Sequence, residues 1–141
     1  MSPDNPNIII DRKQNLLELC QNVSDVPKKD RNGHFKKMQD GSIMTDKKRF
    51  TAELKGAHDF GQHLIILCEH GGQIKTLEDV QKWQNPRLKD SPLAMSGGRL
   101  YTILNRLMLT YDFEIVFCDK RQTGKKIIEL LGVKQSGTEI L

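Results

Sequence analysis

The segment Ile8-Ile9-Ile10-Asp11-Arg12-Lys13 predicts a β-strand that ends in charged residues. Three consecutive β-branched residues are stiff and favour extended backbone. Because residues i and i+2 of a strand point to the same face, we expect Asp11 and Lys13 to lie side by side. A carboxylate in that position can hold a divalent cation, and a lysine can orient an attacking water or stabilise charge. The simpler interpretation is a solvated, charged strand end, which is common in globular proteins.

The apolar patterns in the rest of the chain predict strands and helices in alternation. Two further strands are expected at 63–70 and 113–117, where the apolar runs are short. Helices are expected at 14–23, from 49 onward, at 76–83, at 98–110 and at 122–131, where Gly132 would end the last one. This order predicts an α/β fold with a mostly parallel central sheet flanked by helices.

Length and composition indicate a single domain. The chain has 141 residues, 37% of them hydrophobic, and can bury one core, which we place at residues 1–132 with a C-terminal tail at 133–141. The three cysteines lie within apolar segments, which indicates reduced thiols and an intracellular compartment. The longest apolar run is too short to cross a membrane, and the N-terminus does not resemble a signal peptide. We therefore expect a cytoplasmic protein with no membrane partner.

A basic insertion at about 24–46 separates the first two predicted helices. Pro27, Gly33 and Gly41 interrupt any long helix there, so we expect a mobile loop. Two interpretations are open for this loop: it grips a DNA backbone, since lysines on phosphates release counterions, or it is merely solvated. The net charge of +4 fits a polyanionic partner without proving one. The lysines that would contact DNA are Lys28, Lys29, Lys36 and Lys37.

Several segments together resemble the nuclease domain of the XPF-type structure-specific endonucleases, a branch of the PD-(D/E)xK superfamily. Residues 10–13 match the V/I-E-R-K signature strand with Asp in place of Glu, and residues 49–54 resemble the R-F-x-x-E segment. Residues 117–124, with the sequence FCDKRQTG, resemble the closing segment of the small phage and bacterial members. The resemblance extends over residues 7–131, and it is specific through the combination of its motifs.

The resemblance implies a restriction-endonuclease-like fold and metal-dependent hydrolysis of phosphodiester bonds in duplex or branched DNA, with Mg²⁺ or Mn²⁺ as cofactor. It implies that Asp11 binds the metal, that Lys13 positions or activates the water, and that Arg12 braces the strand or contacts a phosphate. Glu18 and Glu53 are the further candidates for metal ligands. A homodimer is one assembly that the sequence leaves open.

Three basic residues outside the insertion are the remaining candidates for DNA contacts. Arg49 lies four residues before Glu53 on one helix face, so the two form either a surface ion pair or a phosphate contact beside a metal ligand. Lys120 and Arg121 follow the last predicted strand and either contact phosphates or only begin a helix. For Asp119 we favour a helix-capping role.

Two features of the chain depart from the family pattern. Family members carry an acidic β-hairpin before the signature strand, whereas here a turn-like segment at 1–6 leads directly to that strand. The family's later Asp is replaced by Leu17, next to Glu18. We therefore expect an N-terminally truncated nuclease fold: a fragment, a natural truncation, or a domain whose missing strands come from elsewhere. The alternative is a catalytically impaired DNA-binding or protein-interaction module derived from such a nuclease.

Overall fold

The sheet has three parallel strands in the order β1-β2-β3. In the computed structural model, which describes the backbone of residues 7–139 and the side chains of residues 7–132, these strands are β1 (Ile8–Lys13), β2 (His63–Cys68) and β3 (Glu114–Phe117). The segment 1–6, for which we expected a turn, lies outside the described residues. The predicted α/β class with a parallel central sheet is confirmed.

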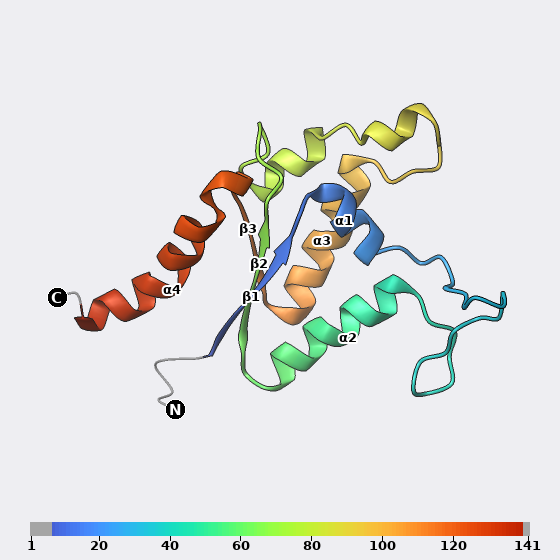
Figure 1. The fold of residues 1–141 in the computed structure, drawn as a ribbon, viewed down its shortest axis with the longest axis horizontal. Helices are drawn as coiled ribbons and strands as arrows, with labels where there is room; N and C mark the ends of the chain where they lie inside the picture. The colour runs from blue at the N-terminus through green and yellow to red at the C-terminus, as the bar shows by residue number, and fades with distance from the viewer. Residues whose placement is uncertain (1–6, 140–141) are drawn as a thin grey trace.

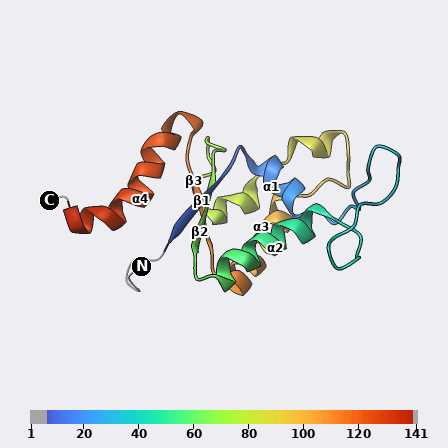
Figure 2. The same ribbon diagram turned by 60° about the horizontal axis from the view of Figure 1, so that its bottom comes forward.

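Helices cover both faces of the sheet, and three of them pack on the same face. Helices α1 (Leu16–Asn22), α2 (Asp46–Asp59) and α3 (Gly97–Tyr111) lie on one side of the strands, and α4 (Thr123–Glu139) lies on the other (Figures 1 and 2). Within the described residues, every helix falls short of the length and apolar character that a membrane crossing requires.

The main core lies between the sheet and the three helices on its first face. Strand β2 contributes Leu64, Ile66 and Cys68, while Ile65 and Leu67 alternate onto the opposite face. The buried helix residues of this core are Leu16, Leu19, Phe50, Leu54, Leu100, Leu104 and Leu107. All five β2 residues after His63 are buried, which explains why this strand has a continuous apolar sequence.

Side-chain caps fix where the helices of the first face begin. Asn15, Thr45 and Ser96 each accept a hydrogen bond from the backbone N–H three residues later, at the start of α1, α2 and α3. Helix α2 therefore begins directly after Thr45, three residues before the predicted start at residue 49. The cap depends on a single polar residue, Thr45, whereas the first buried apolar residue of α2 is Phe50. The apolar pattern therefore predicts a start that is too late.

Two expectations about the C-terminal third are wrong. Gly132 does not end the last helix, because α4 continues to Glu139. Asp119 occupies the N-cap position of a short 3-10 helix, η3 (Lys120–Gln122), but its side chain makes no capping hydrogen bond.

The expected helix at 76–83 is a 3-10 helix, η1 (Leu77–Lys82), in which Asp79 accepts a hydrogen bond from the Thr76 N–H at 3.0 Å.

The basic insertion has more internal structure than the loop we expected. Antiparallel bridges pair Pro27 with Thr45, Lys29 with Phe35 and Lys37 with Ile43. Gly33 and Gly41 have φ of 81° and 89°, the left-handed conformation that tight turns require and that glycine adopts without strain. Gly33 and Gly41 thus lie in the turns of two small irregular hairpins. These hairpins are at the end of the molecule opposite to α4 (Figure 1).

Candidate functional site at the edge of strand β1

Asp11 and Lys13 lie on the same face of β1 and contact each other. The Lys13 Nζ is 3.2 Å from the Asp11 Oδ2. Lys13 is buried, with 9% of its side chain exposed, whereas 34% of the Asp11 side chain is exposed. The ammonium also lies 5.6 Å from the centre of the Phe50 ring on α2, a cation–π geometry. The predicted side-by-side arrangement is therefore present, with Asp11 as the member that solvent reaches.

A hollow of about 420 Å³ opens where β1 meets α2. Asp11 and Glu53 both line it, and its other walls are mostly apolar, with Phe50 and Leu54 among them. We call it the β1-edge hollow. Strand β1 is an edge of the sheet, because in the described part of the chain its only strand partner is β2. The hollow therefore adjoins a row of backbone groups that have no strand partner among residues 7–139.

The carboxylates of the β1-edge hollow do not complete a metal site by themselves. Residues 7–132 contain no group of three or more His, Cys, Asp or Glu side chains that could hold a metal ion. Asp11 and Glu53 supply carboxylate oxygens, the donors that Mg²⁺ and Mn²⁺ prefer. The donor chemistry fits such a cation, and two carboxylates would leave the other positions of an octahedral ion to water and phosphate oxygens.

Glu18 lies apart from this hollow and has a structural contact of its own. Its Oε1 accepts a hydrogen bond from the Gln14 N–H at 2.7 Å, while its own N–H donates to the Asn15 Oδ1 at 3.0 Å. The pair resembles a capping box at the start of α1, except that Glu18 accepts the N–H of Gln14 rather than that of the N-cap residue Asn15. Glu18 therefore fixes the first turn of α1, and its side chain borders a different cavity from that of Asp11.

Arg49 and Glu53 are both exposed on α2 and do not pair with each other or with another ion in the described residues. The surface ion pair that their spacing allowed is absent. Both side chains are consequently available to an external partner, Glu53 at the β1-edge hollow and Arg49 one helical turn earlier.

Arg12 points to the opposite face of β1 and joins a buried ionic cluster that we did not predict. Its guanidinium donates to both carboxylate oxygens of Glu69, at 3.3 and 3.2 Å, and the Thr123 hydroxyl donates to Glu69 Oε2. Only 4% of the Glu69 side chain is exposed. The hydrogen bonds from Thr123 and Arg12 lower the pKa of Glu69. This cluster, the Glu69 clamp, ties β1, the end of β2 and the start of α4 together, so Arg12 braces the strand.

Lys120 and Arg121 line a second recess, at the carboxyl ends of the parallel strands. The recess has a volume of about 440 Å³ and also includes Gln14, Glu69 and His70. Ligands of open α/β sheets bind beyond this end of the strands. The structure therefore brings Lys120 and Arg121 to the same end of the sheet as Arg12, which contacts Glu69 of this recess.

The four insertion lysines lie far from both sites and differ in how they are engaged. Lys28 forms an ion pair with Asp46 at 3.0 Å, and the Lys29 Nζ lies 5.2 Å from the centre of the Phe35 ring. Lys36 and Lys37 are exposed and form no ion pair in the described part of the chain. Two of the four lysines are thus free to meet an anionic partner.

His70, in the recess at the carboxyl ends of the strands, makes the stability of the start of α1 depend on pH. Its Nδ1 accepts a hydrogen bond from the Leu16 N–H at 3.0 Å, and burial lowers its pKa. Because the folded-state pKa lies below the unfolded value, this contribution to stability is fully present above about pH 6.5 and is lost as the pH falls through the folded pKa. We expect the free energy of unfolding in urea to decrease between about pH 7 and pH 5.

A matched variant isolates this effect. His70→Asn keeps an acceptor at nearly the same place as Nδ1 but does not titrate in this range, so the decrease should become smaller. Measurements stay above about pH 5, where the carboxylate of Glu69, with its lowered pKa, remains ionised. An equal decrease in both proteins would show that the Leu16–His70 hydrogen bond does not couple folding to protonation.

Sequence reasoning missed Glu69 and Thr123 because their partners are 57 and 54 residues away in the chain. One local signal was present: Glu69 follows directly after five buried apolar residues, a position in which a carboxylate needs a partner. Comparisons of the chain with protein-family models, curated proteins and solved structures found no match in any of the three.

Proposed function

We propose that the β1 edge is the centre of a DNA endonuclease of the XPF type that depends on Mg²⁺ or Mn²⁺. The observation that carries this proposal is the contact between Asp11 and Lys13 on one strand face, beside a hollow that Glu53 also lines. A bound divalent metal lowers the pKa of water and stabilises charge on a phosphodiester group. Asp11 and Glu53 would hold the metal through carboxylate oxygens.

Lys13 is suited to orient or activate the attacking water. Its side chain is held between Asp11 and the Phe50 ring, so the ammonium has a fixed position and few alternative rotamers. Desolvation strengthens its attraction for a developing negative charge. Arg12 has the positioning role, because its bidentate bond to Glu69 fixes the strand that carries Asp11.

The unpaired edge of β1 supports a restriction-endonuclease-like fold that is completed by further strands. A strand laid along Ile8–Lys13 would pair with backbone groups that have no strand partner among residues 7–139. If it carried acidic residues, it would add carboxylates beside Asp11 and raise the number of metal ligands. We propose that further strands complete the sheet at this edge, and that they come from a segment outside residues 7–139 or from another chain.

A catalytically impaired DNA-binding or protein-interaction module is the second candidate. It is favoured by the small number of carboxylates at the hollow, since residues 7–132 contain no group of three metal-binding side chains. In such a module the basic residues would still bind DNA, whereas Asp11 would only neutralise the buried Lys13. Cleavage assays distinguish the two candidates, and binding assays do not.

Both candidates predict DNA binding that weakens steeply with salt. Each lysine on a phosphate contributes about 0.9 to the slope of log K against log salt concentration for duplex DNA. Because Lys36 and Lys37 are exposed and form no ion pair in the described residues, Lys36→Ala/Lys37→Ala should reduce the slope by up to about 1.8. Fluorescence anisotropy with duplex and branched DNA at several salt concentrations measures it.

The control removes the same charge at the opposite end of the molecule. Lys75 and Lys126 line a recess beside α4, far from the insertion (Figure 1). Lys75→Ala/Lys126→Ala should leave the contribution of the insertion unchanged. If the insertion variant has the same salt slope as the unmodified chain, the two lysines do not contact the DNA backbone and the insertion is only solvated.

A further inference from the structure

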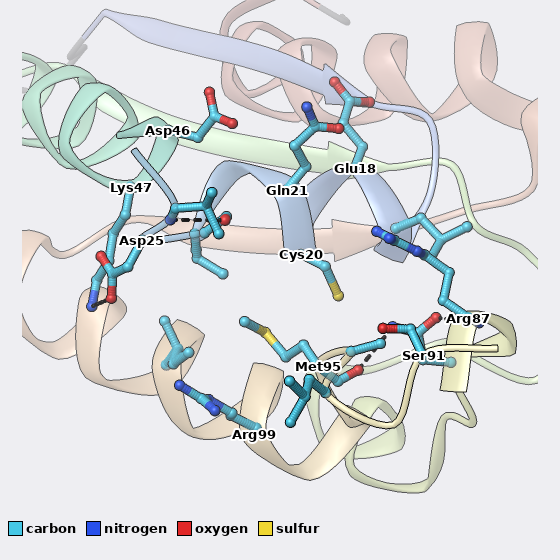
Figure 3. Close-up of a pocket in the computed structure, with 18 of the residues that line it drawn as sticks. Glu18, Cys20, Gln21, Asp25, Asp46, Lys47, Arg87, Ser91, Met95 and Arg99 are labelled. Atoms are coloured by element: carbon cyan, nitrogen blue, oxygen red, sulfur yellow. Dashed lines mark hydrogen bonds and ion pairs between the residues drawn. The ribbon is translucent and has the colours of Figure 1, made fainter. Parts of the chain in front are cut away.

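A second surface, separate from the β1-edge hollow, has the features of a protein-binding groove. It has a volume of about 1240 Å³ and lies between α1, α3, the segment 85–95 and the beginning of the insertion (Figure 3). We call it the α1–α3 groove. Neither Asp11, Lys13 nor Glu53 lines it, so its occupant is independent of the proposed nuclease site.

The floor of the α1–α3 groove is apolar. Cys20 on α1 points toward Met95 across the groove (Figure 3). Val23 and Ile103 also line the groove. Burial raises the pKa of Cys20 to about 11, so the residue is a neutral thiol and behaves as a small apolar side chain. Leu93 also lines the groove, and because 95% of it is exposed it adds apolar surface that a partner can cover.

One wall of the groove carries three arginines with no ion-pair partner. Arg99 and Arg106 project from α3, and Arg87 projects from the 3-10 helix η2 (Pro86–Lys89). All three are exposed, and the ion pairs found in the described residues include none of them. These arginines are therefore free to pair with carboxylates from outside the chain.

The carboxylates at the groove are already engaged. Asp46 pairs with Lys28 at 3.0 Å, Asp25 lies 3.9 Å from Lys47, and Glu18 accepts the N–H of Gln14. The two lysines and the three carboxylates thus satisfy one another or the backbone. Among the described residues, one lining carboxylate, Glu18, and the three arginines have no ion-pair partner, so the unpaired charge at the groove is net positive.

The spacing along α3 defines the shape of a complementary ligand. Arg99, Thr102, Ile103 and Arg106 follow the pattern i, i+3, i+4, i+7 and so form one stripe along the helix. Seven residues of a helix rise by about 10.5 Å, which separates the two arginines by about two turns. A second helix laid along α3 would meet positive charge, an apolar residue, and positive charge again at the same interval.

We propose that the α1–α3 groove binds an acidic amphipathic helix of a partner protein, which lies along α3. Two of its carboxylates, seven residues apart, meet Arg99 and Arg106, and the apolar residues between them cover Ile103 and Met95. Helix-in-groove recognition of this kind uses anchors at i, i+3, i+4 and i+7. A nucleic-acid strand fits less well, because among the described residues no aromatic side chain lines the groove to stack on bases.

The test uses a labelled helical peptide of about 20 residues, long enough to hold helix, with Glu at i and i+7 and Leu at i+3 and i+4. Fluorescence anisotropy with the full chain should show salt-sensitive binding. A peptide with Gln in place of both Glu should bind about tenfold more weakly, since two exposed ion pairs are lost. R99E/R106E should weaken binding of the Glu peptide at least as much, and a peptide with Lys in those positions should bind this variant.

The variant and its control leave the fold intact. Ser96 is the N-cap of α3, so Arg99→Glu places Glu three residues later and creates a capping box, while Arg106 is exposed. Lys75→Glu/Lys82→Glu makes the same charge change at two exposed positions outside the groove and should not affect peptide binding. Circular dichroism melting confirms that each variant is folded.

Two results would overturn the proposal. The first is the absence of any binding of the Glu peptide to the unmodified chain at millimolar concentration. The second is that an oligothymidylate displaces the peptide, binds more tightly than it, and loses its affinity in R99E/R106E, which would assign the groove to single-stranded nucleic acid. Neither result depends on DNA cleavage or on metal binding at Asp11, so this inference and the proposed nuclease function fail separately.

Discussion

Adding an acidic strand along the open edge of β1 should raise Mg²⁺-dependent DNA cleavage by orders of magnitude over that of the 141-residue chain. In the chain itself, the β1-edge hollow offers Asp11 and the exposed Glu53, and in the proposed nuclease these two carboxylates would hold a divalent metal weakly. A hairpin fused before residue 7, with carboxylates facing Asp11, would supply the missing ligands. Single-turnover cleavage of branched DNA with Mg²⁺ and with Mn²⁺ measures the gain, which arises because hydrolysis depends on metal-bound water.

Substitutions that preserve shape identify the residues responsible for this gain. In the extended protein, Asp11→Asn and Lys13→Met should each remove it and leave DNA binding largely intact, since Met keeps the buried stem against Phe50. Asp59→Ala is the matched control, an exposed carboxylate on α2 that pairs with Lys55 outside the hollow. If the extended protein is inert with both metals, the binding-module alternative replaces the nuclease. If the unextended chain already cleaves well, another carboxylate must complete the site.

Gly97→Ala should lower the free energy of unfolding by about 2–3 kcal/mol, because α3 and η1 pack through the backbone at this position. Gly97 is buried at the first turn of α3, and a Cβ there would overlap the carbonyl oxygens of Val80 and Trp83. A carbonyl oxygen of the main chain cannot rotate away as a side chain can, so the two elements must separate. Urea denaturation followed by Trp83 fluorescence measures the loss.

The neighbouring glycine is an internal control for this prediction. A Cβ at Gly98 meets no atom within 4 Å, and the residue does not need a left-handed conformation. Gly98→Ala should therefore be neutral or stabilising by about 0.5–1 kcal/mol, because it reduces the freedom of the unfolded chain. Equal effects of the two substitutions would contradict close packing of α3 on η1.

The sequence was sufficient for the features that depend on local patterns. The β-branched run before Asp11 and the apolar run before Glu69 predict two strands, and the alternation of elements predicts a parallel sheet. The contact between Asp11 and Lys13 follows from the two-residue period of a strand. Each of these predictions needs only residues that are close in the chain.

Features that depend on distant residues were not predictable in this way. The Glu69 clamp joins Arg12 and Thr123 across more than fifty residues, and no periodic pattern encodes such a pair. The sequence alone could therefore not decide whether Arg12 stabilises β1 or contacts a phosphate. That choice depends on the Arg12–Glu69 contact, which only the structure shows. The α1–α3 groove has the same origin, because Cys20 and Met95 meet only when α1 and the segment 85–95 pack together.

The position of bound Mn²⁺ tests the central claim, a divalent-metal site at Asp11, most directly and without any added strand. Paramagnetic Mn²⁺ broadens NMR signals of nearby nuclei even when binding is weak. At substoichiometric Mn²⁺, we predict selective loss of the amide signals of Asp11, Arg12 and Glu53 in the unmodified chain, and recovery of these signals in Asp11→Asn. Broadening that is centred on other carboxylates, or that is unchanged by Asp11→Asn, would contradict a metal site at the β1 edge.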